Sequence, residues 1–206
     1  MEISEIELVE SWLSNEQSDF VDKVVALDKT ALKQDDSWNQ EGGSSGRTIV
    51  LSDGQIFEKI AVNFSSISGV SLPEAATLKR PDLKGNSFKA VGLSIVSHPR
   101  NPYVPTAHQN LRLFSTTGER KVTWWFGGGI DLTPYFGFVE DAVNWHKAAE
   151  KVCNPYGKNV YSEFKKQCDN YFKIKHRSEH RGIGGLFFDD VNCWPFETCF
   201  NFIKDV

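Results

Sequence analysis

The sequence predicts an α+β fold in which a largely antiparallel β-sheet lies between helical segments of the chain. Two observations support this prediction. Strand-forming runs follow one another between residues 47 and 128 with short connections, which is typical of antiparallel strands. Segments with helical spacing come before and after these runs instead of alternating with them, which argues against a doubly wound parallel sheet. A single domain over residues 1–206 is the simplest organisation, because the sequence has no internal repeat.

The N-terminal part of the sequence predicts a helix followed by a hairpin. Ser4 and Glu7 have the spacing of a capping box, and apolar residues recur at helical spacing to about residue 33. The run EGGSSGR (41–47) is expected to be a loop, and a plain connection is preferred to a phosphate-binding loop because the Gly-Lys-Ser/Thr ending is missing. Residues 47–69 then predict a hairpin that turns at Asp53-Gly54.

The rest of the chain continues the sheet and then returns to helices. We expect a loop over residues 71–87, because this stretch contains two prolines and many polar residues. The expected strands are residues 88–99, 107–116, 121–128 and 184–191. Helical spacing predicts helices over residues 138–152 and 160–180, with Gly182 at the end of the second, and a short helix at the C-terminus.

Composition and charge exclude several classes of protein. With 40% apolar residues the chain is globular, and a formal charge of −4 argues against a general nucleic-acid or membrane-surface binder. The four cysteines have no C-x-x-C spacing, so buried reduced thiols are expected instead of a disulfide framework or a structural zinc site. The N-terminus does not resemble a secretory signal, and no apolar run approaches the ~20 residues of a membrane span. We therefore expect a cytoplasmic protein.

Two expected strands carry polar side chains on one face only, because alternate residues of a strand point the same way. The polar face of residues 88–99 carries Ala90, Gly92, Ser94, Val96 and His98, and that of residues 107–116 carries His108, Asn110, Arg112 and Phe114. Leu111 and Leu113 point to the opposite, apolar face. If the strands pair with these faces aligned, the surface could seat something broad and flat. The alternative is an ordinary solvated sheet face.

Asp131 follows three glycines at the end of an expected strand and precedes Leu-Thr-Pro. Glycines let a backbone turn sharply or approach a ligand closely, so the carboxylate could be displayed to accept N–H groups. The alternative is that Asp131 or Thr133 caps a helix that begins near Pro134. Both interpretations can hold together, with Thr133 as the cap and Asp131 left for a ligand.

Histidines and arginines later in the chain also allow two interpretations. The helical His146 and His176 are each more typical of a hydrogen-bonded residue than of a metal ligand, although histidines on separate elements could still gather around one metal. Arg177 and Arg181 lie beside a glycine turn. They could bind carboxylates, for which a planar guanidinium is well suited, or they could complement the C-terminus of a helix.

Several motifs resemble those of the oxygen-dependent coproporphyrinogen-III oxidases of haem biosynthesis. They are SIVSHPRNPYVPTAHQNLRLF, WWFGGGIDLTPYFGFVEDAVNWH and CDNYFKIKHRSEHRGIGGLFFDD, with SWNQEGGSSGR and FEKIAVNFS before them. The resemblance implies that two propionates of coproporphyrinogen III become vinyl groups of protoporphyrinogen IX, with O2 consumed and CO2 and hydrogen peroxide released. It also implies a homodimer, no organic cofactor, and a broad antiparallel sheet sandwiched between layers of helices.

The resemblance also implies roles for individual residues. Asp131 would accept the pyrrole N–H groups, His108 would donate or accept a proton, and Arg112 would pair with a propionate. The implied catalytic residues are thus His108, Asp131 and Arg112, and the implied substrate-binding residues are Ser94, Asn110, Leu111, Arg112 and Asp131. Bacterial members are described with divalent-metal ligands, such as ligands of Mn²⁺, at the positions of His98, His108, His146 and His176. His180 has no counterpart in this set.

The family pattern continues beyond Val206, so we expect this chain to lack the family's C-terminal third. Two other functions stay open on the sequence alone. A tetrapyrrole-binding module would bind the macrocycle without turnover. A metal-dependent hydrolase built on the histidines would act without oxygen and lose its activity to chelators.

Overall fold

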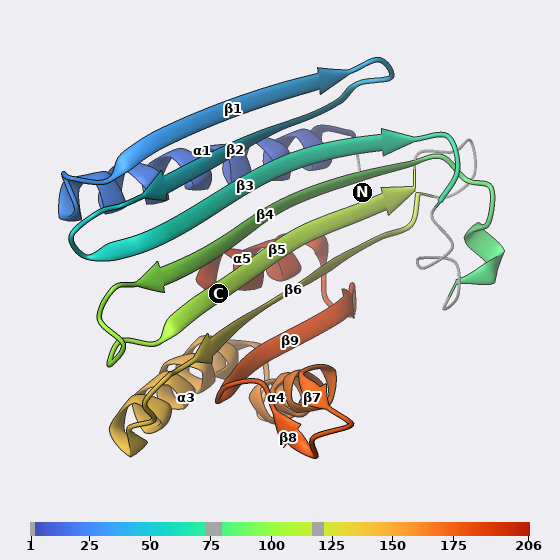
Figure 1. The fold of residues 1–206 in the computed structure, drawn as a ribbon. Helices are drawn as coiled ribbons and strands as arrows, with labels where there is room; N and C mark the ends of the chain where they lie inside the picture. The colour runs from blue at the N-terminus through green and yellow to red at the C-terminus, as the bar shows by residue number, and fades with distance from the viewer. Residues whose placement is uncertain (1–2, 73–79, 117–121) are drawn as a thin grey trace.

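A computed structural model describes residues 3–72, 80–116 and 122–206 of the chain. Its main feature is one antiparallel sheet (Figure 1). The strands are β1 (Leu32–Gln40), β2 (Ser44–Ser52), β3 (Phe57–Gly69), β4 (Phe88–Pro99), β5 (Thr106–Thr116), β6 (Trp124–Thr133) and β9 (Gly184–Val191). They lie in the order β1-β2-β3-β4-β5-β6-β9, so six consecutive strands form a meander and β9 is added beside β6.

In the described parts of the chain, four α-helices pack on this sheet. They are α1 (Ile3–Leu27), α3 (Val139–Cys153), α4 (Val160–Tyr171) and α5 (Phe196–Asp205). The chain leaves β6 through α3 and α4, forms the small hairpin β7 (Lys173–Ile174) and β8 (Glu179–His180), and returns as β9. Short 3₁₀ turns lie at Pro81–Leu83 and Asn154–Tyr156.

The hydrophobic core lies on one face of the sheet. The alternation along β4 and β5 buries Val91, Leu93, Ile95, Leu111 and Leu113, as expected from the sequence. A stripe of α1 residues covers β3, β4 and β5, and α3, α4 and α5 contribute buried residues to the same core. Figure 1 shows α1 and α5 behind the sheet in this view. The helices of the described ranges therefore cover one face and leave the polar side chains on the other.

The α+β fold with a broad antiparallel sheet is confirmed, but the described helices lie on one face of the sheet where layers on both faces were expected, and several expected boundaries are wrong. The N-terminal helix ends at Leu27 and is followed by β1, an edge strand with the polar sequence LKQDDSWNQ. Its residues are mostly exposed, so the apolar alternation that marks a half-buried strand is missing. The loop expected at 41–47 is shorter, because β2 already begins at Ser44. Ser4 lies inside α1 and is not its N-cap.

The later boundaries also differ from the expectation. The helix expected over residues 160–180 ends at Tyr171 and gives way to the β7–β8 hairpin. The strand expected from residue 121 begins at Trp124 and continues to Thr133. Residue 121, and residues 73–79 of the loop expected over 71–87, lie outside the described residues.

The structure agrees with the expected state of the cysteines. All four are free, and Cys153, Cys168 and Cys199 are buried while Cys193 is exposed. Burial raises the pKa of Cys153 to about 12, because the thiolate would lose its hydration. Among the helices described, none is both long and apolar enough to cross a membrane.

Candidate active site on the polar face of the sheet

The strand register brings the predicted polar residues together on the face away from the core. Ser94 lies opposite Asn110, and Asn110 lies opposite Gly129 on β6. In the next row His108 lies opposite Asp131. Neighbouring strands are only about 5 Å apart, so side chains in one row are in direct reach of each other. The alignment of faces expected from the sequence is therefore present.

Asp131 and His108 form the central contact of this face. The Nδ1 atom of His108 donates to Oδ2 of Asp131 over 2.7 Å. The Asp131 side chain is only 2% exposed, whereas His108 is 31% exposed. The imidazole thus connects a carboxylate embedded in the sheet surface to the space above it, an arrangement suited to moving a proton.

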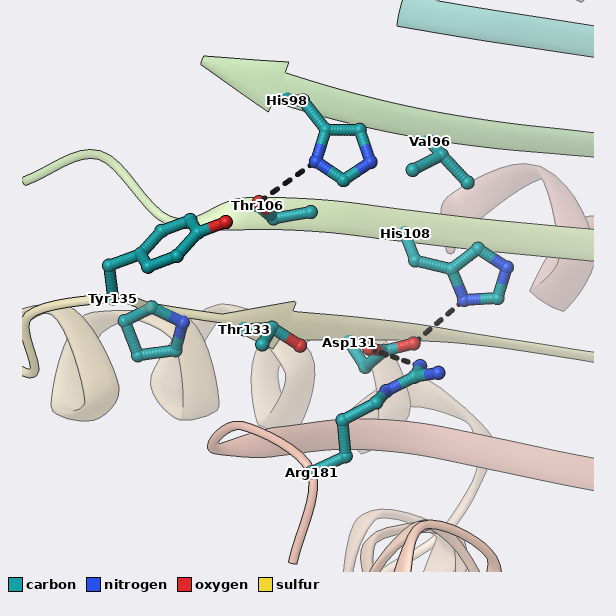
Figure 2. A pocket seen from close by; sticks show the side chains of 9 residues that line it. Val96, His98, Thr106, His108, Asp131, Thr133, Tyr135 and Arg181 are labelled. Carbon is teal, nitrogen blue, oxygen red and sulfur yellow. Dashed lines mark hydrogen bonds and ion pairs between the residues drawn. The ribbon is translucent and has the colours of Figure 1, made fainter. Parts of the chain in front are cut away.

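Arg181 holds the other oxygen of the same carboxylate. It follows β8, and its Nη2 atom donates to Oδ1 of Asp131 over 2.8 Å. Its guanidinium lies over the ring of Phe172, 3.9 Å from the ring centroid, a cation–π contact. Figure 2 shows His108 and Arg181 reaching Asp131 from opposite sides. The carboxylate is therefore held between an imidazole and a guanidinium.

A β-bulge in β9 supplies two further carboxylates to the face. The pairing between β6 and β9 shifts between Phe126 and Gly128. Asp189 and Asp190 on β9 therefore lie together opposite the single residue Gly127 on β6. Asp190 has a left-handed backbone conformation with φ 58°. Asp189 accepts from Nη2 of Arg112 over 3.2 Å, and Asp190 accepts from Nη2 of Arg80 over 3.1 Å. The bulge thus directs both aspartates toward arginines.

Glycine at position 127 leaves the space in which Arg112 crosses the face. A Cβ atom on Gly127 would lie 2.7 Å from Nε of Arg112 and 2.9 Å from Oδ1 of Asp189. Gly92 lies on the other side of Arg112 in the same row. The floor between β4 and β6 is therefore low on both sides of the guanidinium, which suits a broad, flat ligand.

Two adjoining cavities open above this floor. One, of about 420 Å³, is lined by His98, Thr106, Thr133 and Tyr135. The other, of about 310 Å³, is lined by Asn110, Arg112, Tyr171, Phe172 and Phe187. His108, Asp131 and Arg181 line both of them. The Asp131 carboxylate therefore lies at the junction of two hollows that together form one extended cleft.

An aromatic stack closes one end of the polar face. The rings of Phe88 and Phe114 stack with centroids 5.2 Å apart, and Phe114 stacks on Trp125 at 4.8 Å. Arg80 covers Trp125, with its guanidinium carbon 4.3 Å from the ring centroid. Leu83 is buried together with Phe88 and Trp125, and these residues form a small hydrophobic cluster that is separate from the main core. The polar face is thus bounded by an apolar wall at this end.

Most of the residues expected at the site lie on this face, but Leu111 does not. Its side chain is 3% exposed and points into the core, so only its backbone can contact a ligand on the polar face. The expected helix cap is wrong too. Thr133 is the last residue of β6, and α3 begins at Val139 with Phe138 at its N-cap. Asp131 is therefore a strand residue of the cleft.

No three of the four histidines expected as metal ligands lie close enough together among the described residues to share a metal, although His98 and His108 line the same cavity. His98 is exposed and lies 3.4 Å from the Thr106 hydroxyl, and His176 lies exposed in the turn between β7 and β8. The Nε2 atom of His146 donates to the backbone oxygen of Ile183, and its Nδ1 atom accepts from the Tyr161 hydroxyl. Among the described residues, no three histidine, cysteine, aspartate or glutamate side chains are arranged to hold a metal ion. The donor set does not fit a shared metal in this structure.

Sequence reasoning missed the aromatic residues beside Arg181. Tyr171 stacks on Phe187, with ring centroids 4.1 Å apart, and Phe172 lies under the guanidinium. The glycine turn after Arg181 indicated a change of direction, but it did not indicate that Arg181 would reach Asp131. Cys168 lies close below the site, where burial and, secondarily, the charge of Asp131 raise its pKa to about 12. That thiol is therefore not a nucleophile near neutral pH.

The site combines a proton-transfer pair, two arginines that can bind carboxylates, and a flat floor within one cleft. These features suit an anionic ligand with several N–H groups. The sequence model of one protein family, described as Coproporphyrinogen III oxidase, matches residues 8–206 of the chain.

Proposed function

The chain belongs to the coproporphyrinogen III oxidase family, and we propose that it is the oxygen-dependent type of this oxidoreductase of haem biosynthesis. It converts two propionates of coproporphyrinogen III to the vinyl groups of protoporphyrinogen IX. Each propionate loses CO2 and two electrons. One O2 accepts these two electrons with two protons and leaves as hydrogen peroxide.

The observation that supports this proposal most is the position of Asp131. Its carboxylate lies 2.7 Å from His108 at the junction of the two cavities, and it is 2% exposed. A porphyrinogen has inward-pointing pyrrole N–H groups, which need an acceptor when they leave water. A carboxylate in the floor of a flat cleft provides that acceptor at one point, beneath the centre of the macrocycle.

The remaining polar groups of the face suit the periphery of the same ligand. Arg112 binds a propionate, since a guanidinium pairs with a carboxylate through two parallel hydrogen bonds. Ser94 and Asn110 share one row of the register and contact the substrate beside Arg112. These contacts fix the macrocycle in one orientation, so that one peripheral propionate faces the reacting position.

His108 carries the proton in this proposal. Its Nδ1 atom is held by Asp131, which orients the ring and leaves Nε2 toward the cleft. The imidazole accepts a proton from the pyrrole, which makes the electron-rich ring open to attack by O2. The peroxide that forms takes a hydrogen from the propionate, and decarboxylation then yields the vinyl group. No step of the proposal uses a metal or an organic cofactor.

The test compares turnover in air and under nitrogen. Purified protein is incubated with coproporphyrinogen III, and the products are oxidised to porphyrins and separated by chromatography with mass detection. We expect stepwise loss of two carboxyl groups in air only, with one CO2 and one hydrogen peroxide formed for each O2 consumed. Binding without a change of mass would favour a tetrapyrrole carrier. Conversion under nitrogen would overturn the oxygen-dependent type.

The assembly and location of the protein are also proposals. The family resemblance supports a homodimer in the cytoplasm. Light scattering on the purified protein measures the first, and fractionation of cells that express the chain measures the second. A monomer with full turnover would overturn the homodimer as a requirement for activity.

A further inference from the structure

The carboxylate that the proposed function assigns to the pyrrole N–H groups is occupied on both oxygens. Oδ2 of Asp131 accepts from His108 at 2.7 Å, and Oδ1 accepts from Arg181 at 2.8 Å. The side chain is 2% exposed. A carboxylate can accept more than two hydrogen bonds, but the 2% exposure leaves no open approach, so a pyrrole N–H can reach Asp131 only if one of the two partners turns away. The structure therefore raises the question of which partner moves.

The two partners differ in how firmly they are held. His108 belongs to β5 and lies directly opposite Asp131 in the paired strands, so the sheet itself keeps the two residues together. Arg181 lies just after β8, and its side chain is 44% exposed. Its guanidinium rests on the ring of Phe172, a contact that constrains the distance from the ring more than the direction of the N–H groups. Arg181 is therefore the partner that can turn.

A ligand carboxylate offers Arg181 a replacement for Asp131. Arg181 and Arg112 line the same cavity, and each is already paired with an aspartate of the chain, Asp131 and Asp189. We infer that Arg181 exchanges Asp131 for a carboxylate of the substrate, and that this exchange uncovers Asp131 for the pyrrole N–H groups. The inference rests on the proposed function. It makes Arg181 a specificity-determining residue that favours macrocycles with a suitably placed carboxylate.

The exchange keeps the number of ion pairs constant when the substrate is anionic. A neutral macrocycle would separate Arg181 from Asp131 without giving it a new partner. Pairs with one exposed member contribute little, so the resulting loss of affinity is about two- to fivefold. A new charge-assisted pair with the substrate, in contrast, raises the affinity about tenfold to a hundredfold. Binding and uncovering of Asp131 are thus linked through one side chain.

Two ligands of the same shape test this exchange under nitrogen. One is coproporphyrinogen III, and the other is its tetraamide, in which every carboxylate is a neutral amide. Calorimetry measures both affinities for the wild-type protein and for Arg181→Gln. We expect Arg181→Gln to bind coproporphyrinogen III about tenfold to a hundredfold more weakly. The same variant should bind the tetraamide about two- to fivefold more tightly, because Asp131 is already uncovered.

The matched control is Arg177→Gln. Arg177 is on the same hairpin, its side chain is 63% exposed, and it pairs with Glu179 at 2.9 Å. It is not among the described residues that line the two cavities. The control should leave both affinities unchanged. A second measurement uses the wild-type protein alone: the ¹⁵N resonances of the Arg181 guanidinium should shift on adding coproporphyrinogen III and should shift much less with the tetraamide.

The opposite signs of the two changes distinguish the exchange from simpler roles. If Arg181→Gln weakens the binding of both ligands, Arg181 has a structural role and the inference is wrong. If it weakens only coproporphyrinogen III and leaves the tetraamide unchanged, Arg181 binds a carboxylate without covering Asp131, and the inference is again wrong. Failure of the wild-type protein to bind either ligand would instead overturn the proposed function. Should Arg181→Gln not fold, the guanidinium resonances still decide the question.

Discussion

Gly127 and Gly128 are neighbours on β6, and alanine at each position would place a methyl group on opposite faces of the sheet. At Gly127 the new Cβ would lie 2.7 Å from Nε of Arg112 and 2.9 Å from Oδ1 of Asp189. At Gly128 it would lie 2.4 Å from the backbone oxygen of Asn110 and 3.0 Å from the ring of Phe188. The first change disturbs the cleft, and the second disturbs the core. The pair of variants therefore separates substrate binding from stability.

The magnitudes follow from which atoms must move. Ordinary contact begins near 3.4 Å, so Gly128→Ala forces a backbone shift of about 1 Å against packed neighbours. Such overpacking costs about 1–3 kcal/mol, which lowers the Tm of a chain of this size by about 2–12 °C. Gly127→Ala meets only the ends of side chains, and losing the half-exposed Arg112–Asp189 pair costs about 0.2–1 kcal/mol. Gly127→Ala should instead displace the guanidinium of Arg112 and so raise the KM for coproporphyrinogen III about tenfold to a hundredfold.

Circular dichroism at increasing temperature measures Tm, and the conversion of coproporphyrinogen III in air measures kcat and KM. Gly127→Ala should keep a near-native Tm with a raised KM. Gly128→Ala should show a lowered Tm and a smaller rise in KM than Gly127→Ala, because its methyl group points to Phe188 in the core and only the backbone of Gly128 lines the cleft. An unchanged KM in Gly127→Ala would refute the assignment of Arg112 to the substrate. Equal melting of the two variants would refute the separation of the cleft-facing position from the core-facing one.

Three further predictions concern the central carboxylate, acid stability and metal. Asp131→Asn keeps the size of the side chain but removes its charge, and we expect kcat to fall about 10²- to 10³-fold with a Tm near that of the wild type; a fully active Asp131→Asn would contradict the role of Asp131. Asp28 accepts N–H bonds from Gln55, Ile56 and Phe57 and a hydroxyl bond from Thr30, and these, led by Phe57, hold its pKa well below 3.8. The stability that this carboxylate contributes is therefore present above pH 3.8 and lost as the pH falls below it, and Asp28→Asn should remove that part of the acid sensitivity of Tm. Because no three of the candidate histidines are arranged among the described residues to hold one metal ion, dialysis against a chelator should leave turnover unchanged. A loss of turnover that Mn²⁺ restores would show a metal requirement.

The face of the sheet could be predicted from the sequence because it depends only on the alternation of side chains. In the middle of these two strands the buried Val91, Leu93, Ile95, Leu111 and Leu113 alternate with small or polar residues, and the structure pairs the strands with Ser94 opposite Asn110. Asp131 was expected at the site for a different local reason, because the three glycines before it let the backbone come close to a ligand. Each of these features depends on neighbouring residues or neighbouring strands.

The features that escaped prediction depend on longer contacts. Arg181 reaches Asp131 across a helical connection, and neither the spacing nor the composition of the chain indicates this pair. The bulge at Asp189 and Asp190 depends on a register that slips against β6. Strand β1 has exposed polar residues on both faces, so it has no pattern to detect. His146 was expected among metal ligands, but its helix turns it toward Ile183 and Tyr161.

The seam between β6 and β9 has a consequence for local unfolding. Arg112–Asp189, Arg80–Asp190 and Asp131–Arg181 each join a residue that precedes the α3–α4 connection to one that follows it. β9 is an edge strand, and edge elements open at a lower free energy than the centre of a sheet. An opening of this edge would separate the pairs of Asp189 and Asp190 together while the meander stays folded, and it would free the chain that follows Arg181. The charge pattern of the cleft thus exists only while its last strand is docked, and amide exchange along β9 reports directly how often the cleft is complete.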